Sequence, residues 1–189
     1  MVALNPPVCD FGRPASPFDL PGTDGQRHTL ESCRGTNGLL VMFICNHCPF
    51  VKAIIDRLIR DCRELAEHGI GCVAIMSNDV AAYPDDAPAN MQRWAEELAF
   101  PFPYLHDATQ AVAKAYGAVC TPDFFGYNAQ LQLQYRGPAR CIGPRSRPGG
   151  RPARTVRGHD DYCPHRPRPA RSDCLHRLLD QMAHLATPP

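Results

Sequence analysis

Hydrophobic and polar positions alternate in blocks over the first 137 residues, and the blocks differ in period. Two continuous apolar runs, residues 38–45 and 71–77, are typical of strands buried on both faces. Between them, apolar residues recur every three or four positions over residues 49–68, which predicts one amphipathic helix. Pro49 is a residue type favoured in the first turn of a helix, and Gly69 is one favoured just after the last turn. The pattern therefore predicts a strand, a helix and a second strand in succession.

Weaker signals lie on either side of these runs. Residues 19–25 indicate a strand leading into a turn, with Asp24-Gly25 as a hairpin signal. Helices are expected near residues 90–98 and 109–116, and two strands joined at a turn over residues 123–136. Strands that alternate with helices predict an α/β fold, with a central mixed sheet flanked by helices on both faces.

The composition changes after Gly137. Residues 138–189 hold 9 of the 20 prolines and 10 Arg against 4 Asp, whereas residues 1–137 hold 10 Lys or Arg against 15 Asp or Glu. Such a segment buries too little apolar surface to offset its ordering entropy. We therefore expect one domain over residues 1–137 and an irregular Arg/Pro-rich tail that is disordered or translated out of frame. Helical spacing returns only at Cys174.

Length and hydropathy restrict the protein class. A chain of 189 residues that is 44% hydrophobic suits one globular domain. Its longest apolar runs are far shorter than the roughly 20 residues of a membrane-spanning helix, and the N-terminus lacks the pattern of a secretion signal. We expect a cytoplasmic protein without a membrane partner. Its ten cysteines are then mostly reduced thiols with a possible catalytic pair.

Cys45-Asn-His-Cys48 is the most informative motif, because it lies where a buried strand meets the start of a helix. A helix N-terminus stabilises a thiolate and lowers its pKa, and a protonated His47 would add to this effect. We predict that Cys45 is the more exposed thiol and the attacking nucleophile. Cys48 would then resolve the mixed disulfide.

Other interpretations of the pair remain open. It could form half of a zinc site, although no second C-x-x-C or paired His follows at finger spacing. It could also consist of two structural thiols. Haem attachment is excluded because Pro49, not His, follows the second Cys.

Two stretches together resemble a known family. They are Leu39-Leu-Val-Met-Phe-Ile-Cys-Asn-His-Cys-Pro-Phe-Val-Lys and, from Tyr104, Tyr-Leu-His-Asp-Ala-Thr-Gln-Ala-Val-Ala-Lys-Ala-Tyr-Gly-Ala-Val-Cys-Thr-Pro-Asp-Phe-Phe. They are similar to the thioredoxin-like redoxins grouped as alkyl hydroperoxide reductase and thiol-specific antioxidant proteins (AhpC/TSA), over residues 14–137. The resemblance implies a thioredoxin fold and a redox-active Cys45–Cys48 disulfide. Thr121-Pro122 then matches the cis-proline loop that shapes the substrate groove. Cys120 would lie nearby, as a third redox thiol or a small buried side chain.

The sequence also departs from the family patterns. The peroxidase pattern Pro-x-x-x-Thr/Ser-x-x-Cys, aligned on Cys48, meets Cys45 and Val41 instead of Thr/Ser and Pro. No buried carboxylate precedes the pair on its strand, so the general base for Cys48 is not identified. Asp79 and His106 are candidates by their position at strand ends, but both also suit solvated loops.

These observations favour a thiol-disulfide oxidoreductase acting on protein or small-molecule disulfides with a thiol reductant. It would need no cofactor and no metal. The alternative enzyme is a peroxiredoxin-like antioxidant peroxidase that takes peroxides. A further alternative is a non-enzymatic binding module with a basic tail. We do not expect nucleic-acid binding, because aromatic residues other than Tyr162 and a recognised motif are missing from the tail. Cys163, His165, Cys174 and His176 do not follow the usual zinc spacing.

Overall fold

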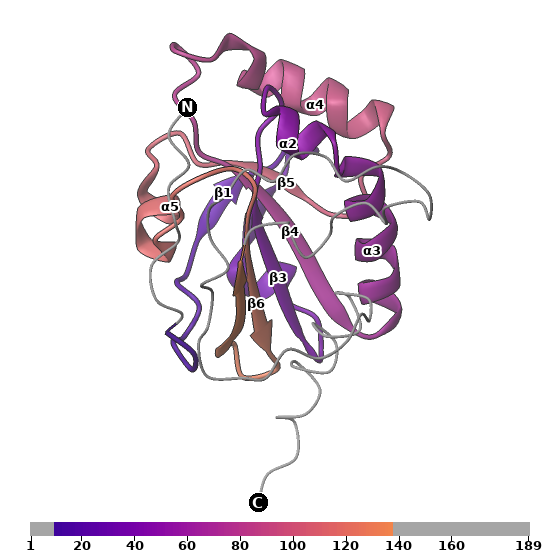
Figure 1. Ribbon diagram of the computed structural model, residues 1–189, viewed down its shortest axis with the longest axis vertical. Coiled ribbons are helices and arrows are strands. Elements are labelled where there is room, and N and C mark those ends of the chain that lie inside the picture. The colour runs from indigo at the N-terminus through magenta and orange to yellow at the C-terminus, as the bar shows by residue number, and fades with distance from the viewer. Residues whose placement is uncertain (1–9, 138–189) are drawn as a thin grey trace, which may run out of the picture.

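A computed structural model describes residues 10–137 and contains a mixed five-stranded sheet in the order β5-β4-β3-β6-β7 (Figure 1). Its strands are β3 (Gly38–Phe43), β4 (Ile70–Met76), β5 (Tyr104–His106), β6 (Asp123–Asn128) and β7 (Leu133–Gly137). Strands β3, β4 and β5 run parallel, whereas β6 and β7 are antiparallel to their neighbours. The predicted α/β class is confirmed. Our predictions for residues 138–189 lie outside the described residues.

The apolar run at residues 38–45 forms the centre of the sheet, because β3 pairs with β4 on one side and β6 on the other. All six of its residues are buried. Successive side chains alternate between the two faces, so Leu40 and Met42 enter one hydrophobic core while Leu39 and Val41 enter the other. Continuous rather than alternating hydrophobicity is therefore what this position requires.

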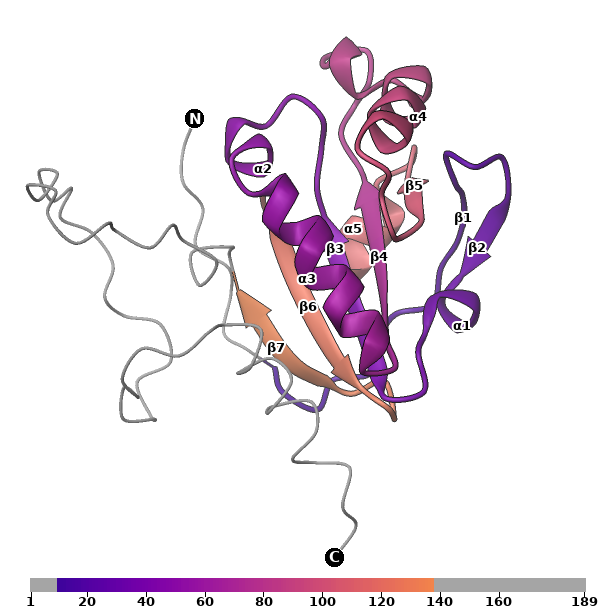
Figure 2. The same cartoon turned by 90° about the vertical axis from the view of Figure 1, so that its right-hand side faces the viewer.

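Helices cover both faces of the sheet, as expected (Figure 2). One face packs against α2 (Pro49–Lys52), α3 (Ile55–Glu67) and α4 (Pro88–Glu97), and the other against α1 (Leu30–Cys33) and α5 (Ala111–Tyr116). None of the helices among residues 10–137 is long and apolar enough to cross a membrane.

The prediction of one continuous helix over residues 49–68 is wrong in one respect, because the structure divides this segment into α2 and α3. At the break, the Ile54 N–H donates to the Val51 carbonyl oxygen, three residues back, and so tightens the turn. Val51 and Ile55 are both buried on either side of it. Hydrophobic spacing does not detect the break, since the apolar face continues through it.

The predicted hairpin is present outside the sheet. Strands β1 (Asp19–Pro21) and β2 (Arg27–Thr29) pair in antiparallel register. Gly25 lies in the turn between them with a φ of 78°, a backbone conformation that glycine adopts without steric cost.

The topology brings three separate segments to one edge of the sheet. The carboxyl ends of β3 and β4 lie together because the strands are parallel, with Phe43 opposite Ile75. Strand β6 begins at the same edge, where Asp123 lies opposite Phe43. The C-x-x-C motif, the loop after β4 and the Thr121-Pro122 dipeptide therefore meet at this edge.

Candidate functional site

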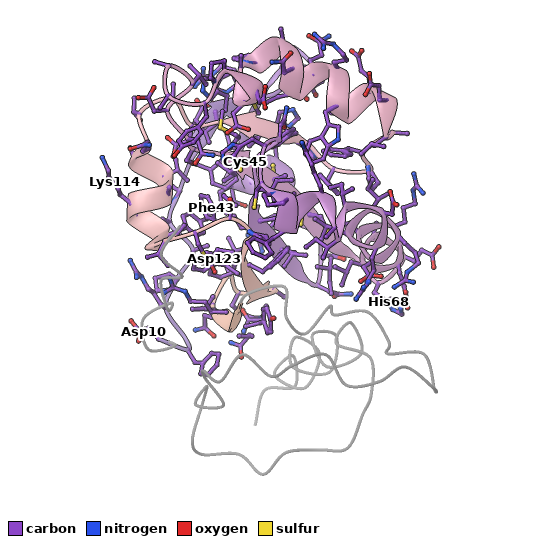
Figure 3. The ribbon with its side chains drawn as sticks, turned by 45° about the horizontal axis from the view of Figure 1, so that its top comes forward. Asp10, Phe43, Cys45, His68, Lys114 and Asp123 are labelled. Atoms are coloured by element: carbon purple, nitrogen blue, oxygen red, sulfur yellow. The ribbon has the colours of Figure 1, made fainter. Side chains whose placement is uncertain are left out.

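The two thiols of the C-x-x-C motif contact the same residue of the loop before β6. Cys45 Sγ lies 3.2 Å from the hydroxyl oxygen of Thr121, and Cys48 Sγ donates to the Thr121 carbonyl oxygen over 3.3 Å. The Thr121–Pro122 peptide bond is cis. Thr121 lies more than 70 positions after either cysteine in the chain, and Figure 3 shows where Cys45 lies among the elements around it. The structure thus brings together the predicted redox pair and the predicted proline loop.

The prediction that Cys45 is the more exposed thiol, with a lowered pKa, is wrong. Cys45 has no exposed surface, and Cys48 is 5% exposed. Burial raises the pKa of the Cys45 thiol, because a thiolate is poorly solvated there. The hydrogen bond with Thr121 lowers that pKa and the nearby charge of Asp86 raises it.

His47 is fixed by a carboxylate that the sequence analysis missed. His47 Nδ1 lies 2.7 Å from Oδ2 of Asp86, whose side chain is fully buried. Oδ1 of the same carboxylate accepts the backbone N–H groups of Asn46 and His47, over 2.7 and 3.2 Å. Asp86 closes the 3₁₀ helix η1 (Pro84–Asp86), and so anchors this helix to the C-x-x-C motif.

Further side chains surround this contact. The Asn78 side-chain amide donates to Asp86 Oδ2 over 2.8 Å, and the Tyr104 hydroxyl donates to the Asn46 side-chain oxygen over 3.0 Å. The Tyr83 ring stacks on the imidazole of His47, with 4.5 Å between ring centroids. In the sequence, these residues belong to a polar loop and strand ends without diagnostic spacing. Only the three-dimensional structure identifies them as neighbours of the pair.

Cys120, the predicted third redox thiol, lies at the same loop and is half-buried. Its Sγ contacts the Pro122 carbonyl oxygen at 3.9 Å. Burial, followed by the nearby charge of Asp123, raises the pKa of its thiol. A redox role for Cys120 stays a prediction.

A second buried carboxylate follows Pro122. Asp123 has no exposed surface and lies 3.8 Å from a guanidinium nitrogen of Arg136. Burial raises the pKa of Asp123 to about 6, although Arg136 acts in the opposite direction. The sequence analysis searched for a buried carboxylate on the strand before the pair, whereas this one lies on the adjacent strand β6.

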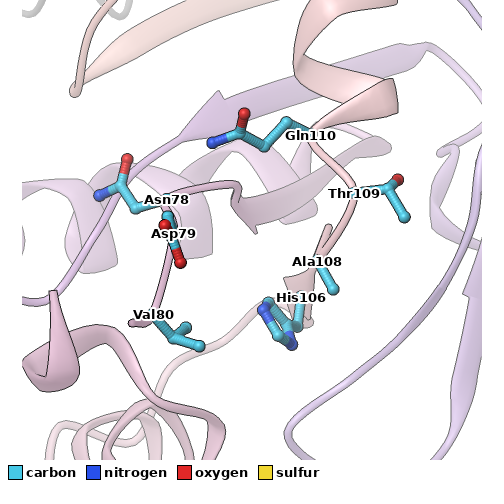
Figure 4. A pocket seen from close by; sticks show the side chains of 7 residues that line it. All are labelled: Asn78, Asp79, Val80, His106, Ala108, Thr109 and Gln110. Carbon is cyan, nitrogen blue, oxygen red and sulfur yellow. The ribbon is translucent and has the colours of Figure 1, made fainter. Parts of the chain in front are cut away.

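The two strand-end candidates, Asp79 and His106, line the same pocket. The pocket has a volume of about 240 Å³ and is bordered by the ends of β4 and β5 (Figure 4). Its lining residues are Asn78, Asp79, Val80, His106, Ala108, Thr109 and Gln110. Asp79 is exposed and accepts the Ala81 N–H, as suits a loop residue. One of the lining residues, Asn78, also donates its side-chain amide to Asp86.

The chain is similar to proteins of known structure. An uncharacterized conserved protein from Geobacillus kaustophilus is 44% identical, with a TM-score of 0.72, over 82% of this chain and 80% of that protein. A hypothetical protein from Sinorhizobium meliloti is 39% identical, with a TM-score of 0.68, over 78% of each chain. No curated protein matches the sequence.

More distant structures share the fold. A thiol:disulfide interchange protein of the thioredoxin family from Chlorobium tepidum is 20% identical, with a TM-score of 0.56, over 70% of this chain and 87% of that one. This likeness confirms the thioredoxin fold that the sequence resemblance implied. A sequence model of the AhpC/TSA family matches residues 11–138. The chain therefore belongs to the AhpC/TSA family of thioredoxin-like redox proteins.

Proposed function

We propose that this protein is a thiol-disulfide oxidoreductase whose redox pair is Cys45 and Cys48. The family and the fold support a redox function in general. The observation that favours disulfide exchange is the contact of both thiols with Thr121, at 3.2 and 3.3 Å. A pair of thiols held side by side can form an intramolecular disulfide without help from another chain.

The proposed reaction has two steps. The Cys45 thiolate attacks one sulfur of a substrate disulfide, forms a mixed disulfide and releases the first substrate thiol. The Cys48 thiolate then attacks the Cys45 sulfur and releases the second. The protein loses two electrons and two protons and ends as the Cys45–Cys48 disulfide. The substrate gains the two electrons and the two protons. An external thiol reductant then regenerates the reduced pair.

His47 and Asp86 help to form the attacking thiolate in this scheme. A ring nitrogen of His47 lies within 4.8 Å of Cys45 Sγ, a distance that one water molecule can bridge. Asp86 contacts the imidazole at Nδ1 over 2.7 Å and so fixes the orientation of the ring. Because burial raises the pKa of Cys45, a nearby proton acceptor matters more here than it would beside an exposed thiol.

Exposed apolar side chains suggest where a substrate binds. Phe50 in α2, Tyr83 beside His47 and Val119 before the proline loop are 65%, 48% and 38% exposed. They belong to the three segments that meet at the pair. Exposed apolar side chains around a reactive group favour a substrate that carries apolar groups. We propose disulfides of proteins or peptides as the substrate class.

A peroxidase is the alternative within the same family. The discriminating experiment is a redox titration in glutathione buffers, with differential alkylation and peptide mass mapping, followed by the same mapping after peroxide treatment. We expect Cys45 and Cys48 to oxidise together at one potential and to react faster with disulfides than with peroxide. Rapid formation of a sulfenic acid would support the peroxidase. Independent oxidation of the two thiols would contradict both enzymes.

A further inference from the structure

Cys45, His47 and Asp86 form a cluster of three different donor groups. One donor atom of each side chain lies within 4.8 Å of a donor atom of the other two. Cys45 and Asp86 have no exposed surface, and the His47 side chain is 29% exposed. In the proposed thiol exchange Asp86 only orients the imidazole, and no step brings its carboxylate to the Cys45 sulfur.

We propose that these three side chains bind a zinc ion when Cys45 is reduced, with water as the fourth ligand. A thiolate, an imidazole and a carboxylate are the donors that zinc takes in proteins, and three protein ligands with one water is a common zinc arrangement. Binding displaces the proton of the Cys45 thiol to solvent. His47 binds as neutral imidazole, with its one ring N–H on the nitrogen that does not contact the ion, and no electrons are transferred.

Neighbouring groups hold two of the ligands in place. Asp86 accepts the Asn46 and His47 backbone N–H groups and the Asn78 amide, while Tyr83 stacks on the imidazole. Hydrogen bonds and packing of this kind orient ligands around a metal and increase its affinity. The ligands come from two segments about 40 residues apart, so sequence spacing alone does not reveal the site.

The charges of the cluster also favour a cation. A Cys45 thiolate would lie within 4.8 Å of the Asp86 carboxylate, so two negative charges would stand side by side. A divalent ion bound to both groups offsets their repulsion. Because Cys45 Sγ cannot bind zinc and form a disulfide at the same time, zinc would block disulfide exchange and oxidation would release zinc. The inference goes beyond the proposed function and requires only that Cys45 be reduced.

The test measures alkylation of Cys45 in the reduced full-length protein, with and without zinc chloride. Peptide mass mapping separates Cys45 from the other cysteines, including those of residues 138–189. We expect zinc to slow alkylation of Cys45, whereas magnesium, which prefers oxygen ligands, leaves the rate unchanged. The Cys48→Ser variant should keep this protection, because its missing thiol is not a ligand.

Two variants test the other ligands. His47→Ala and Asp86→Asn should each weaken zinc binding by at least roughly 10- to 100-fold, the loss typical of removing a group that merely supports a ligand, as judged from the zinc concentration that protects Cys45. His68→Ala, which removes an exposed imidazole at the end of α3, should have no effect. Near-UV circular dichroism checks that Asp86→Asn is folded, and His47→Ala serves if it is not.

Two results would overturn the inference. One is that zinc leaves the alkylation rate of Cys45 in the wild-type protein unchanged. The other is that Cys48→Ser abolishes protection while His47→Ala and Asp86→Asn retain it, which would identify a simple dithiol chelate. The glutathione titration in the absence of zinc tests the redox pair separately, so either idea can fail without the other.

Discussion

Thr121 contacts both thiols of the C-x-x-C motif, but with different atoms. Its hydroxyl meets Cys45 and lowers the pKa of that thiol, whereas its carbonyl accepts from Cys48. Thr121→Val removes only the hydroxyl. Because a neutral hydrogen bond contributes about 0.5–1.5 kcal/mol, alkylation of Cys45 near pH 7 should slow roughly two- to tenfold. Mass mapping of the alkylated peptides measures the rate.

Thr121→Ser is the matched control, since it keeps the hydroxyl and should restore most of the rate. The rate in the wild-type protein should keep rising with pH beyond 9, the ordinary pKa of a cysteine, because burial raises the pKa of Cys45. A rate that levels off near neutral pH would show that this thiol is activated rather than suppressed.

Asp123 should make stability depend on pH. Its pKa is raised from 3.8 to about 6 in the folded protein, so the folded state holds a proton that the unfolded state releases. The resulting stabilisation is complete below pH 3.8 and is lost as the pH rises through 6. Relative to Asp123→Asn, the wild-type free energy of unfolding should therefore increase by about 1 kcal/mol from pH 7 to pH 5.

Urea unfolding at the two pH values checks this difference. Asp19→Asn serves as the control, because Asp19 is an exposed carboxylate paired with Arg27 at the surface. The Asp19 variant should follow the wild-type dependence on pH, while the Asp123 variant departs from it. If all three proteins change in parallel, Asp123 is ionised across the whole range.

At the scale of elements, the contact between β4 and the segment after α1 depends on a small residue. A Cβ atom on Gly71 would lie 2.0 Å from the Cys33 carbonyl oxygen and 2.8 Å from the Gly35 backbone nitrogen. Both neighbours are main-chain atoms, which cannot rotate away. Gly71→Ala should therefore lower the free energy of unfolding by about 1–3 kcal/mol, as measured in urea.

The control for Gly71→Ala is Glu67→Ala, in the exposed last turn of α3. A surface change of this kind normally shifts stability by less than about 0.5 kcal/mol. Equal stability of the Gly71 and Glu67 variants would mean that the backbone at residues 33–35 moves freely to accept a methyl group.

At the scale of the whole molecule, every contact described at the site lies within residues 45–136. The family match also ends at residue 138. We therefore predict that a chain ending at Gly137 forms the Cys45–Cys48 disulfide at the same potential as the full chain. Parallel glutathione titrations compare them. A shifted potential, or loss of the folded circular dichroism spectrum, would show that residues 138–189 contribute to the domain.

The fold was predictable from local patterns where burial is uniform along a segment. The central strand β3 was expected because all of its positions are apolar, and all are buried. The break between α2 and α3 escaped prediction because the apolar face continues across it. The position of the redox motif followed from the same logic, since a strand and a helix are joined at Cys45 to Cys48. The contact with Thr121 followed from the family resemblance rather than from spacing.

The sequence by itself determined the period of each element and the position of the C-x-x-C motif at a strand-to-helix junction, because these depend on residues close together in the chain. Only the tertiary structure decided the state of the site. The burial of Cys45 reversed the expected direction of its pKa shift. Asp86 became the partner of His47 across 39 residues. Desolvation and charge pairing depend on which distant segments pack together, and that information is absent from any local pattern.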